Sequence, residues 1–292
     1  MTDSANWPFL DKQSETNFQE LINCIANEQA TAFIGAGLAQ QAGLPGWPGL
    51  LEALYSASTL SPQPFNPRTA LKQFGQLQDN LVGDFLPIVR NLLNPPGLQL
   101  PQSYNVLSDI PFDRFATTNF DELLHILAVG VRGDQEHSIF EYPSPGLLNK
   151  NYFYLHGRLK SAKTPNDLVL SEVAYARAYM NDSELSRLLK LLLDEPVLFV
   201  GFSLTDYDLL NEIRQNKRYR IVARDSDGVR SERYQAEPKW FAILPANPNE
   251  LVQPTLQERI KPVELDLLRQ LAQDKANELD DSGIKAIWYD WS

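Results

Sequence analysis

The stretch Thr31-Ala32-Phe33-Ile34-Gly35-Ala36-Gly37 decides the fold, because it joins a short apolar run to a glycine-rich turn. Such a run, bounded by glycine, predicts a buried strand that turns sharply into a helix. Glycines at this kind of turn let the backbone approach a phosphate, and the N-terminus of the next helix offers unpaired N–H groups to an anion. The spacing of Gly35, Gly37 and Gly43 is not the GxGxxG of ordinary dehydrogenases, so the turn alone is equally typical of structural punctuation.

Outward from this turn, short apolar runs alternate with helical patterns along the chain. The runs predict strands at residues 114–117, 152–155, 197–200, 240–244, 260–263 and 284–289. The patterns predict helices at residues 120–127, 185–193, 204–213 and about 250–258, and from Glu264 onward. Thr16 and Gln19 have the spacing of a capping box, which predicts a helix before the first strand. The alternation indicates an α/β, Rossmann-like fold with a mostly parallel sheet covered by helices.

One segment departs from this alternation and reads as helical throughout. Between Pro62 and Pro101, apolar residues such as Leu71, Phe74 and Leu77 recur at helical spacing, and no long strand fits there. We therefore expect a helical module inserted at about residues 60–101 within a single domain that spans residues 1–292. A chain of this length can bury a large core without metals or disulfides.

Composition excludes several classes of protein. The one cysteine, Cys24, allows no internal disulfide and no cysteine-rich zinc cluster, so we expect no metal. The N-terminus lacks the features of a signal peptide, and no apolar run approaches the roughly 20 residues of a membrane helix. We therefore expect a cytoplasmic protein. The net charge of -11 opposes nucleic-acid binding. The basic stretch at residues 214–233 is interpreted as a solvated hairpin or partner surface.

Four predicted strands end in small or polar residues. These ends are Gly35-Ala36-Gly37, Thr117-Thr118-Asn119-Phe120-Asp121, His156-Gly157 and Gly201-Phe202-Ser203. Because the carboxyl ends of parallel strands meet at one edge of an open sheet, the four blocks are expected to converge where ligands of this fold class bind. A phosphate-binding turn, an amide, an imidazole and a hydroxyl together suit a nucleotide.

Each of these polar residues also has a structural interpretation. His156 could be a core imidazole, Asn119 a turn former and Ser203 a helix cap. Asp121 directly precedes a helical run and could cap it. His125 and His137 fall in a helical pattern and a loop, respectively, and receive no role.

Taken together and in order, the four blocks resemble the signature of the Sir2 (sirtuin) superfamily. The resemblance implies that the glycine turn holds the pyrophosphate of NAD, that the Thr-x-Asn-x-Asp block lines the nicotinamide-ribose pocket, and that the histidine acts beside the ribose. It also implies that the last block contacts the adenosine side. The implied site residues are Gly35, Ala36, Gly37, Asn119, Asp121, His156, Gly201 and Ser203.

The chain departs from the sirtuin deacetylases in three places. A zinc ribbon needs four thiolates, and the chain has one cysteine. Leu38 replaces the serine that often follows Gly-Ala-Gly, and Gly46-Trp47-Pro48 stands where deacetylases have Asp-Phe-Arg. The forms present instead resemble the Sir2-like effectors of bacterial anti-phage defence, which destroy NAD.

The leading hypothesis is therefore an NAD glycohydrolase that yields nicotinamide and ADP-ribose. The nicotinamide ring of NAD is already positively charged, so its departure as a neutral molecule needs little help from a general acid. The barrier therefore lies in an oxocarbenium-like ribosyl state that water must capture. His156, with an ordinary pKa near 6.5, would accept a proton, and Asn119 would orient the water or a hydroxyl. Asp121 would stabilise the cationic ribosyl state.

Two alternative functions remain open, and the resemblance also implies a protein partner. The chain could instead be a non-catalytic NAD or ADP-ribose-binding regulatory subunit, or an NAD-dependent deacylase or ADP-ribosyltransferase. Family resemblance implies a separate sensor or regulator, such as a HerA-type ATPase, and an oligomer or hetero-complex. Trp288 and Trp291 near the C-terminus fit an edge strand or a partner contact better than a base-stacking platform.

Overall fold

The computed structural model describes residues 12–143, 150–180, 183–202, 207–226, 238–245, 275 and 277–289. Within them, seven strands form one sheet in the order β3-β4-β2-β1-β5-β6-β7, and every neighbouring pair is parallel. The strands are β1 Thr31–Ile34, β2 Arg114–Thr117, β3 Ile139–Glu141, β4 Tyr152–Tyr154, β5 Val197–Val200, β6 Trp240–Pro245 and β7 Ile284–Tyr289. The prediction of an α/β fold with a mostly parallel sheet is confirmed, while β3 was not predicted.

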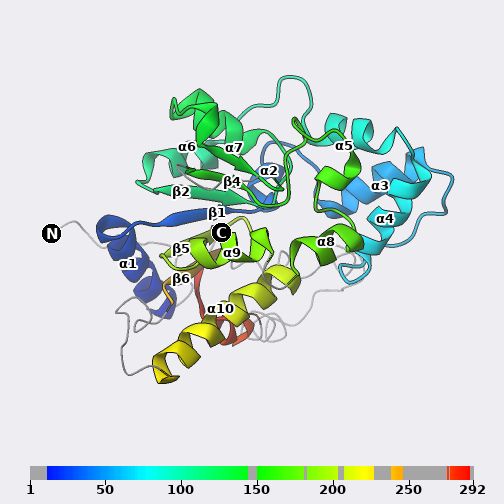
Figure 1. Cartoon of the computed structure of the whole chain (residues 1–292). Helices are drawn as coiled ribbons and strands as arrows, with labels where there is room; N and C mark the ends of the chain where they lie inside the picture. Colours follow the sequence, from blue (N-terminus) through cyan, green and yellow to red (C-terminus); the bar gives the residue numbers. More distant parts are fainter. Residues whose placement is uncertain are drawn as a thin grey trace, which may run out of the picture.

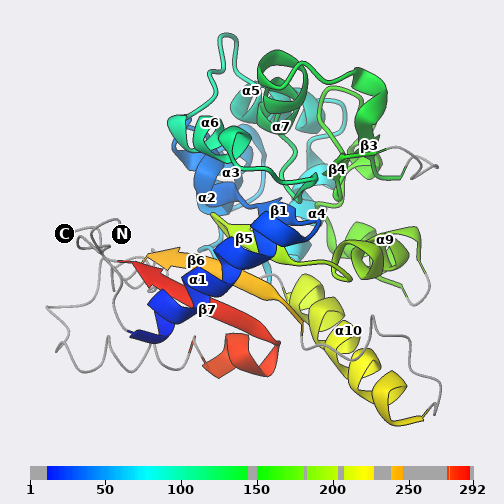
Figure 2. The same cartoon turned by 90° about the vertical axis from the view of Figure 1, so that its left-hand side faces the viewer.

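Helices cover both faces of this sheet (Figures 1 and 2). The α-helices are α1 Lys12–Asn27, α2 Ala36–Gln40, α3 Trp47–Ala57, α4 Ala70–Asn80, α5 Phe85–Leu93, α6 Gln102–Asp109, α7 Leu123–His125, α8 Glu172–Ala178, α9 Glu184–Leu192 and α10 Tyr207–Ser226. The described residues also contain the short helices η1 Ile126–Val131, η2 Glu136–Ser138 and η3 Pro165–Asp167.

Alternation along β1 explains how the two faces are filled. Phe33 lies in a core cluster with residues of α8, α9 and α10, whereas its neighbours Ala32 and Ile34 lie in a second cluster with residues of α1, α6 and α7. Successive side chains of a strand point to opposite faces, so one buried strand supplies both cores. This double burial gives the continuous apolar run from which β1 was predicted.

A third core belongs to the helical module. Helices α3, α4 and α5 lie together on one side of the molecule in Figure 1, and Leu54, Phe74 and Val89 are fully buried between them. Two residues from outside the module, Phe120 and Leu159, belong to the same cluster. Both follow strands of the sheet, so the module packs against the loops at the carboxyl edge.

The structure corrects two local predictions. Helix α1 begins at Lys12, so Thr16 lies inside the helix and donates a hydrogen bond to the Lys12 carbonyl (2.9 Å) instead of capping it. Contacts with β7 explain the earlier start, because the Ser14 hydroxyl accepts a hydrogen bond from the Trp288 amide at 3.0 Å.

The second correction concerns the basic stretch. Residues 214–226 continue helix α10 rather than forming a hairpin, and residues 227–233 lie outside the described residues. The elements predicted at 250–258, at 260–263 and directly after Glu264 also lie outside them. In the part of the chain that the structure describes, no helix is both long and apolar enough to cross a membrane.

Candidate functional site

The four blocks singled out in the sequence follow four strands that are neighbours in the sheet. In the sheet β4, β2, β1 and β5 are neighbours, so His156, Asn119, Gly35 and Gly201 follow strands that lie side by side. The turns are joined: the Leu155 amide donates to the Thr117 carbonyl at 2.9 Å, and the Gly35 amide donates to the Val200 carbonyl at 2.9 Å. Strand order reverses at β1, where the chain continues first to β2 and later to β5 on the other side. Ligands of open α/β sheets bind at such a reversal.

The glycine turn is built around a close approach of two backbones. A Cβ on Gly35 would lie 2.4 Å from the Gly201 carbonyl oxygen, and one on Gly37 would lie 2.9 Å from it. Gly201 has a φ of +65°, and a Cβ there would lie 2.8 Å from the Leu38 amide nitrogen. The Gly37 amide donates to the Gly201 carbonyl at 2.8 Å. The glycines therefore allow the backbones that follow β1 and β5 to approach each other closely, whether or not they also bind a phosphate.

Of the two other predicted residues at these turns, the structure describes Ala36 but not Ser203. Ala36 begins α2 directly after Gly35. Ser203 lies outside the described residues.

Asn119 lies in the turn after β2 with its side-chain amide nitrogen buried. Its backbone amide donates to the Thr117 hydroxyl at 3.0 Å, which fixes the turn after β2. Its side-chain Nδ2 is buried and meets no well-aligned hydrogen-bond acceptor within the described part of the chain. The amide also contacts the Tyr104 phenol: burial and the Asp121 charge raise the pKa of that phenol well above its ordinary value, and a side-chain hydrogen bond with Asn119 lowers it in part. A buried amide donor without a well-aligned acceptor is costly, so an acceptor on a ligand at this turn would stabilise it.

Asp121 is buried at the start of α7. Its Oδ1 accepts a hydrogen bond from the Leu123 amide at 3.0 Å, so the side chain does support the helix start. Burial raises the pKa of the carboxyl from 3.8 to about 7, against the lowering effect of backbone hydrogen bonds from Leu123 and Asp121 itself, and the neighbouring Glu122 charge raises it further. The carboxyl group therefore changes its charge near neutral pH.

His156 lies in an aromatic enclosure rather than at the surface. The residue is 1% exposed, and its Nε2 is 2.7 Å from the Tyr179 hydroxyl. Its ring is 5.0 Å from the ring of Tyr175 and 6.4 Å from that of Phe120, centroid to centroid. Burial lowers the pKa of the imidazole from 6.5 to about 3. His156 is thus neutral at physiological pH, which differs from the ordinary value assumed from the sequence.

The glycine after His156 is required by the backbone. Gly157 has a φ of +89°, and a Cβ on it would lie 2.4 Å from the Asp167 carbonyl oxygen. Only glycine adopts this conformation without strain and leaves room for the carbonyl. The His-Gly pair is therefore a turn that brings the chain from β4 onto the helical module.

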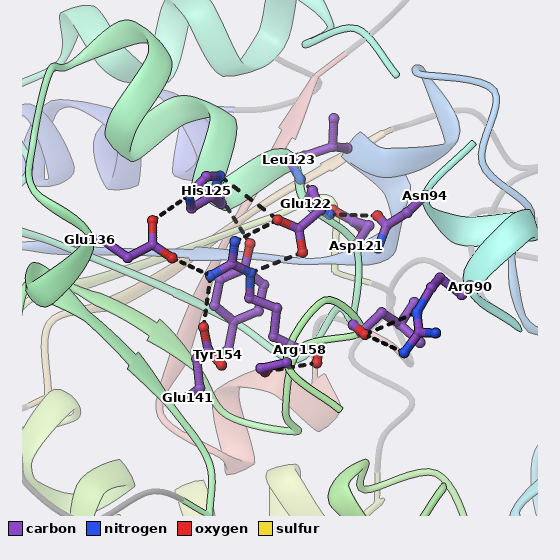
Figure 3. Close-up of polar contacts among 12 residues, drawn as sticks. Arg90, Asn94, Asp121, Glu122, Leu123, His125, Glu136, Glu141, Tyr154 and Arg158 are labelled. Atoms are coloured by element: carbon purple, nitrogen blue, oxygen red, sulfur yellow. Dashed lines mark hydrogen bonds and ion pairs between the residues drawn. The ribbon is translucent and has the colours of Figure 1, made fainter. Parts of the chain in front are cut away.

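Sequence reasoning missed a charged cluster next to these residues (Figure 3). Arg158, with a side chain 1% exposed, binds Glu122 with two hydrogen bonds of 2.9 and 2.5 Å. It also donates to Glu136 at 2.9 Å and to Glu141 at 2.7 Å. Burial alone would lower the pKa of Arg158, but the hydrogen bonds that it donates to Glu122 and Glu136 raise it. His125, given no role from the sequence, contacts Glu136 at 2.5 Å.

The position of this cluster relative to the predicted site was partly readable from the sequence. Arg158 comes two residues after His156, and Glu122 comes directly after Asp121. These two charged residues, each next to a block that ends a strand, were the feature of the sequence that could have indicated the cluster. The described residues contain no group of three or more histidine, cysteine, aspartate or glutamate side chains arranged to hold a metal ion.

Comparison with known proteins identifies the family of this chain. The profile of the SIR2-like domain matches residues 113–263, which is more than half of the chain and includes the blocks at β2, β4 and β5. The chain belongs to the SIR2-like family.

Two curated relatives extend the comparison. This SIR2-like chain is 25% identical over 199 residues to a protein named NAD(+) hydrolase ThsA from Cytobacillus dafuensis, covering 67% of this chain and 39% of the relative. It is 23% identical over 223 residues to NAD(+) hydrolase ThsA from Bacillus cereus (strain MSX-D12), covering 69% of this chain and 44% of the relative. The chain thus spans about two fifths of the length of these relatives.

Proposed function

We propose that this SIR2-like chain is an NAD glycohydrolase. In the reaction, the bond between nicotinamide nitrogen and ribose carbon breaks, the electron pair leaves with nicotinamide, and water adds to the ribosyl carbon and releases a proton. The products are nicotinamide and ADP-ribose. The observation that carries the proposal is the placement of Asn119, Asp121 and His156 after the neighbouring strands β2 and β4, next to the glycine turn of β1. The two relatives named NAD(+) hydrolase support it.

The proposed binding roles follow the edge of the sheet. Gly35, Ala36 and Gly37 would face the pyrophosphate of NAD, and Gly201 and Ser203 the adenosine side. Asn119 and Asp121 would face the nicotinamide ribose. NAD is the substrate in this scheme, and no metal takes part.

The proposed chemical roles use the electrostatics of the site. The buried Nδ2 of Asn119 would donate to the attacking water or to a ribose hydroxyl, holding it in line. Cationic NAD beside Asp121 would lower the pKa of that carboxyl from about 7, so binding favours the carboxylate that stabilises the oxocarbenium-like state. His156 is neutral, so its role would be to accept a hydrogen bond from a ribose hydroxyl or from water in place of Tyr179.

One observation favours a second function. His156 is buried, and its Nε2 is already engaged by the Tyr179 hydroxyl. A chain that only binds NAD or ADP-ribose, as a regulatory subunit, needs no free base and would keep this arrangement. The two functions differ in whether nicotinamide is released.

The test is the release of nicotinamide from NAD, measured by chromatography with the purified chain alone and with the product of the neighbouring gene. We expect His156→Ala and Asn119→Ala to lower turnover at least a hundredfold, because each removes a group that orients the reacting atoms. The matched control is His137→Ala, which replaces an exposed histidine of η2 and should retain full turnover. NAD binding without release under every condition would establish the regulatory alternative.

We further propose that the enzyme acts as an anti-phage effector that depletes NAD when activated. The proposal includes a separate sensor or regulator, such as a HerA-type ATPase or another nucleotide-handling defence protein, and an oligomer or hetero-complex. A chain that stays monomeric in light scattering, cleaves NAD at its full rate alone and gains nothing from its genomic neighbour would refute this regulation.

A further inference from the structure

Helix α5 of the helical module contacts both loops that carry the proposed site residues. We propose that Arg90 and Asn94, one turn apart on α5, are positioning residues. Asn94 holds the loop after β2 and Arg90 holds the loop after β4, so that together they fix the positions of the two loops relative to each other. The inference rests on the proposed function for its kinetic prediction only. The contacts that carry it are independent of any reaction.

Asn94 holds the loop after β2. It is the C-cap residue of α5, and its Oδ1 accepts a hydrogen bond of 2.8 Å from the amide of Glu122. Glu122 follows Asp121 directly and is the N-cap residue of α7, where amides lack partners within their own helix. Asn94 therefore supplies from another helix the acceptor that the start of α7 requires, 28 residues away in the chain.

Arg90 holds the loop after β4. Its Nε and Nη2 donate to the Leu159 carbonyl at 3.3 and 3.2 Å, and Nη2 also donates to the Ala162 carbonyl at 2.9 Å. Leu159 lies three residues after His156. Figure 3 shows Arg90 and Asn94 on the same side of the cluster formed by Arg158 and its carboxylates, each directed at one of the two loops.

The two loops also contact each other at these points. The Leu159 amide donates to the Phe120 carbonyl at 3.0 Å, and Phe120 and Leu159 are both buried in the core of the helical module. Phe120 lies between Asn119 and Asp121 in the chain, and its ring faces that of His156. A displacement of α5 would therefore shift Asn119, Asp121 and His156 relative to one another.

The experiment compares, at each of the two residues, a substitution that removes the contact with a conservative substitution that keeps part of it. Asn94→Leu removes the acceptor, whereas Asn94→Asp keeps an oxygen in place and should rescue it. Arg90→Met removes the donors, whereas Arg90→Lys retains one charged donor and should rescue in part. The matched control is Asn91→Ala on the exposed face of α5.

The first readout needs no activity. Hydrogen–deuterium exchange should rise about tenfold in residues 118–124 for Asn94→Leu, which loses one hydrogen bond to its loop, and in residues 157–163 for Arg90→Met, which loses three. Each variant should affect its own loop more than the other, and Asn91→Ala should affect neither. Unchanged exchange in both loops would overturn the proposal, as would equal acceleration across the whole chain.

The second readout separates positioning from stability. In nicotinamide release at saturating NAD, kcat should fall about tenfold for Asn94→Leu and Arg90→Met with KM changed less than twofold, because the reacting groups are misaligned while the binding surface remains. Asn94→Asp should restore kcat. Equal losses in Asn94→Leu and Asn94→Asp would overturn the positioning role. If the wild type releases no nicotinamide under any condition, the proposed function fails and the exchange data alone decide this inference.

Discussion

Asp121 and His156 should give the stability of this protein two opposing dependences on pH. Burial raises the pKa of Asp121 from 3.8 to about 7 and lowers that of His156 from 6.5 to about 3. Between about pH 4 and pH 6.5 the unfolded chain has an ionised aspartate and a protonated histidine, while the folded protein keeps both groups neutral. The folded state thus binds one proton more at Asp121 and one fewer at His156.

The sign of each contribution follows from this proton count. Stability falls with rising pH where the folded state binds more protons, so Asp121 lowers the free energy of unfolding by about 1.4 kcal/mol per pH unit in this window. His156 raises it by the same amount, about 1.4 kcal/mol per pH unit. The two contributions cancel in the wild type. Above about pH 7, the Asp121 penalty is complete at about 4 kcal/mol.

The perturbation is Asp121→Asn, which keeps an oxygen for the Leu123 amide and removes the titration. Relative to the wild type, its free energy of unfolding should rise by about 3 kcal/mol between about pH 4 and pH 6.5. His156→Gln should show the opposite trend, a fall of about 3 kcal/mol over the same range relative to the wild type.

The assay is urea unfolding followed by tryptophan fluorescence at successive pH values, with Asp79→Asn as the control because Asp79 is exposed on α4. Differences from the wild type remove the contribution of all other titrating groups. A curve for Asp121→Asn that runs parallel to the wild type would refute the neutral, buried carboxyl.

Three further predictions concern the scaffold. Gly201→Ala should destabilise the protein by about 3 kcal/mol in urea unfolding, because its φ is positive and a Cβ would meet the Leu38 amide, whereas Gly43→Ala, with a positive φ but open space, should cost about 1 kcal/mol; equal costs would contradict the close approach. EDTA should leave the melting temperature unchanged, and a drop accompanied by stoichiometric zinc in elemental analysis would contradict this. Removing residues 287–292 should lower stability by about 5 kcal/mol, because it deletes Ile287 and Trp288, both buried in β7. A truncated chain that melts normally but fails to assemble would instead make this end a partner contact.

The sequence alone determined the strands that carry the site. β1, β2, β5 and β7 have the predicted bounds, because each is a short apolar run that ends at glycine or a polar residue, and such runs are local signals. The same local signals located the four blocks that end β1, β2, β4 and β5. The helical pattern of the module was predicted in part: α4 and α5 fall inside the interval of about 60–101, whereas α3, Trp47–Ala57, precedes it.

Strand β3, helix α8 and the start of α1 were not predicted from the sequence. β3 has three residues at the edge of the sheet, and its pairing with β4 is a tertiary contact that the local pattern does not show. Helix α8 has seven residues, although Ser171 caps it by accepting from the Ala174 amide. The start of α1 depended on contacts with β7, which lies about 270 residues away in the chain.

Only the tertiary structure decided the chemistry of the site residues. A histidine and an aspartate carry no sign of their burial in the sequence, yet burial moves the pKa of His156 to about 3 and that of Asp121 to about 7. The partners of Arg158 and Arg90 are equally invisible, because the Arg90 contact to Leu159 joins residues 69 apart and depends on how the module packs. The sequence thus determined which residues end the strands, since that information is local. Their protonation and their support depend on the neighbours that folding brings to them.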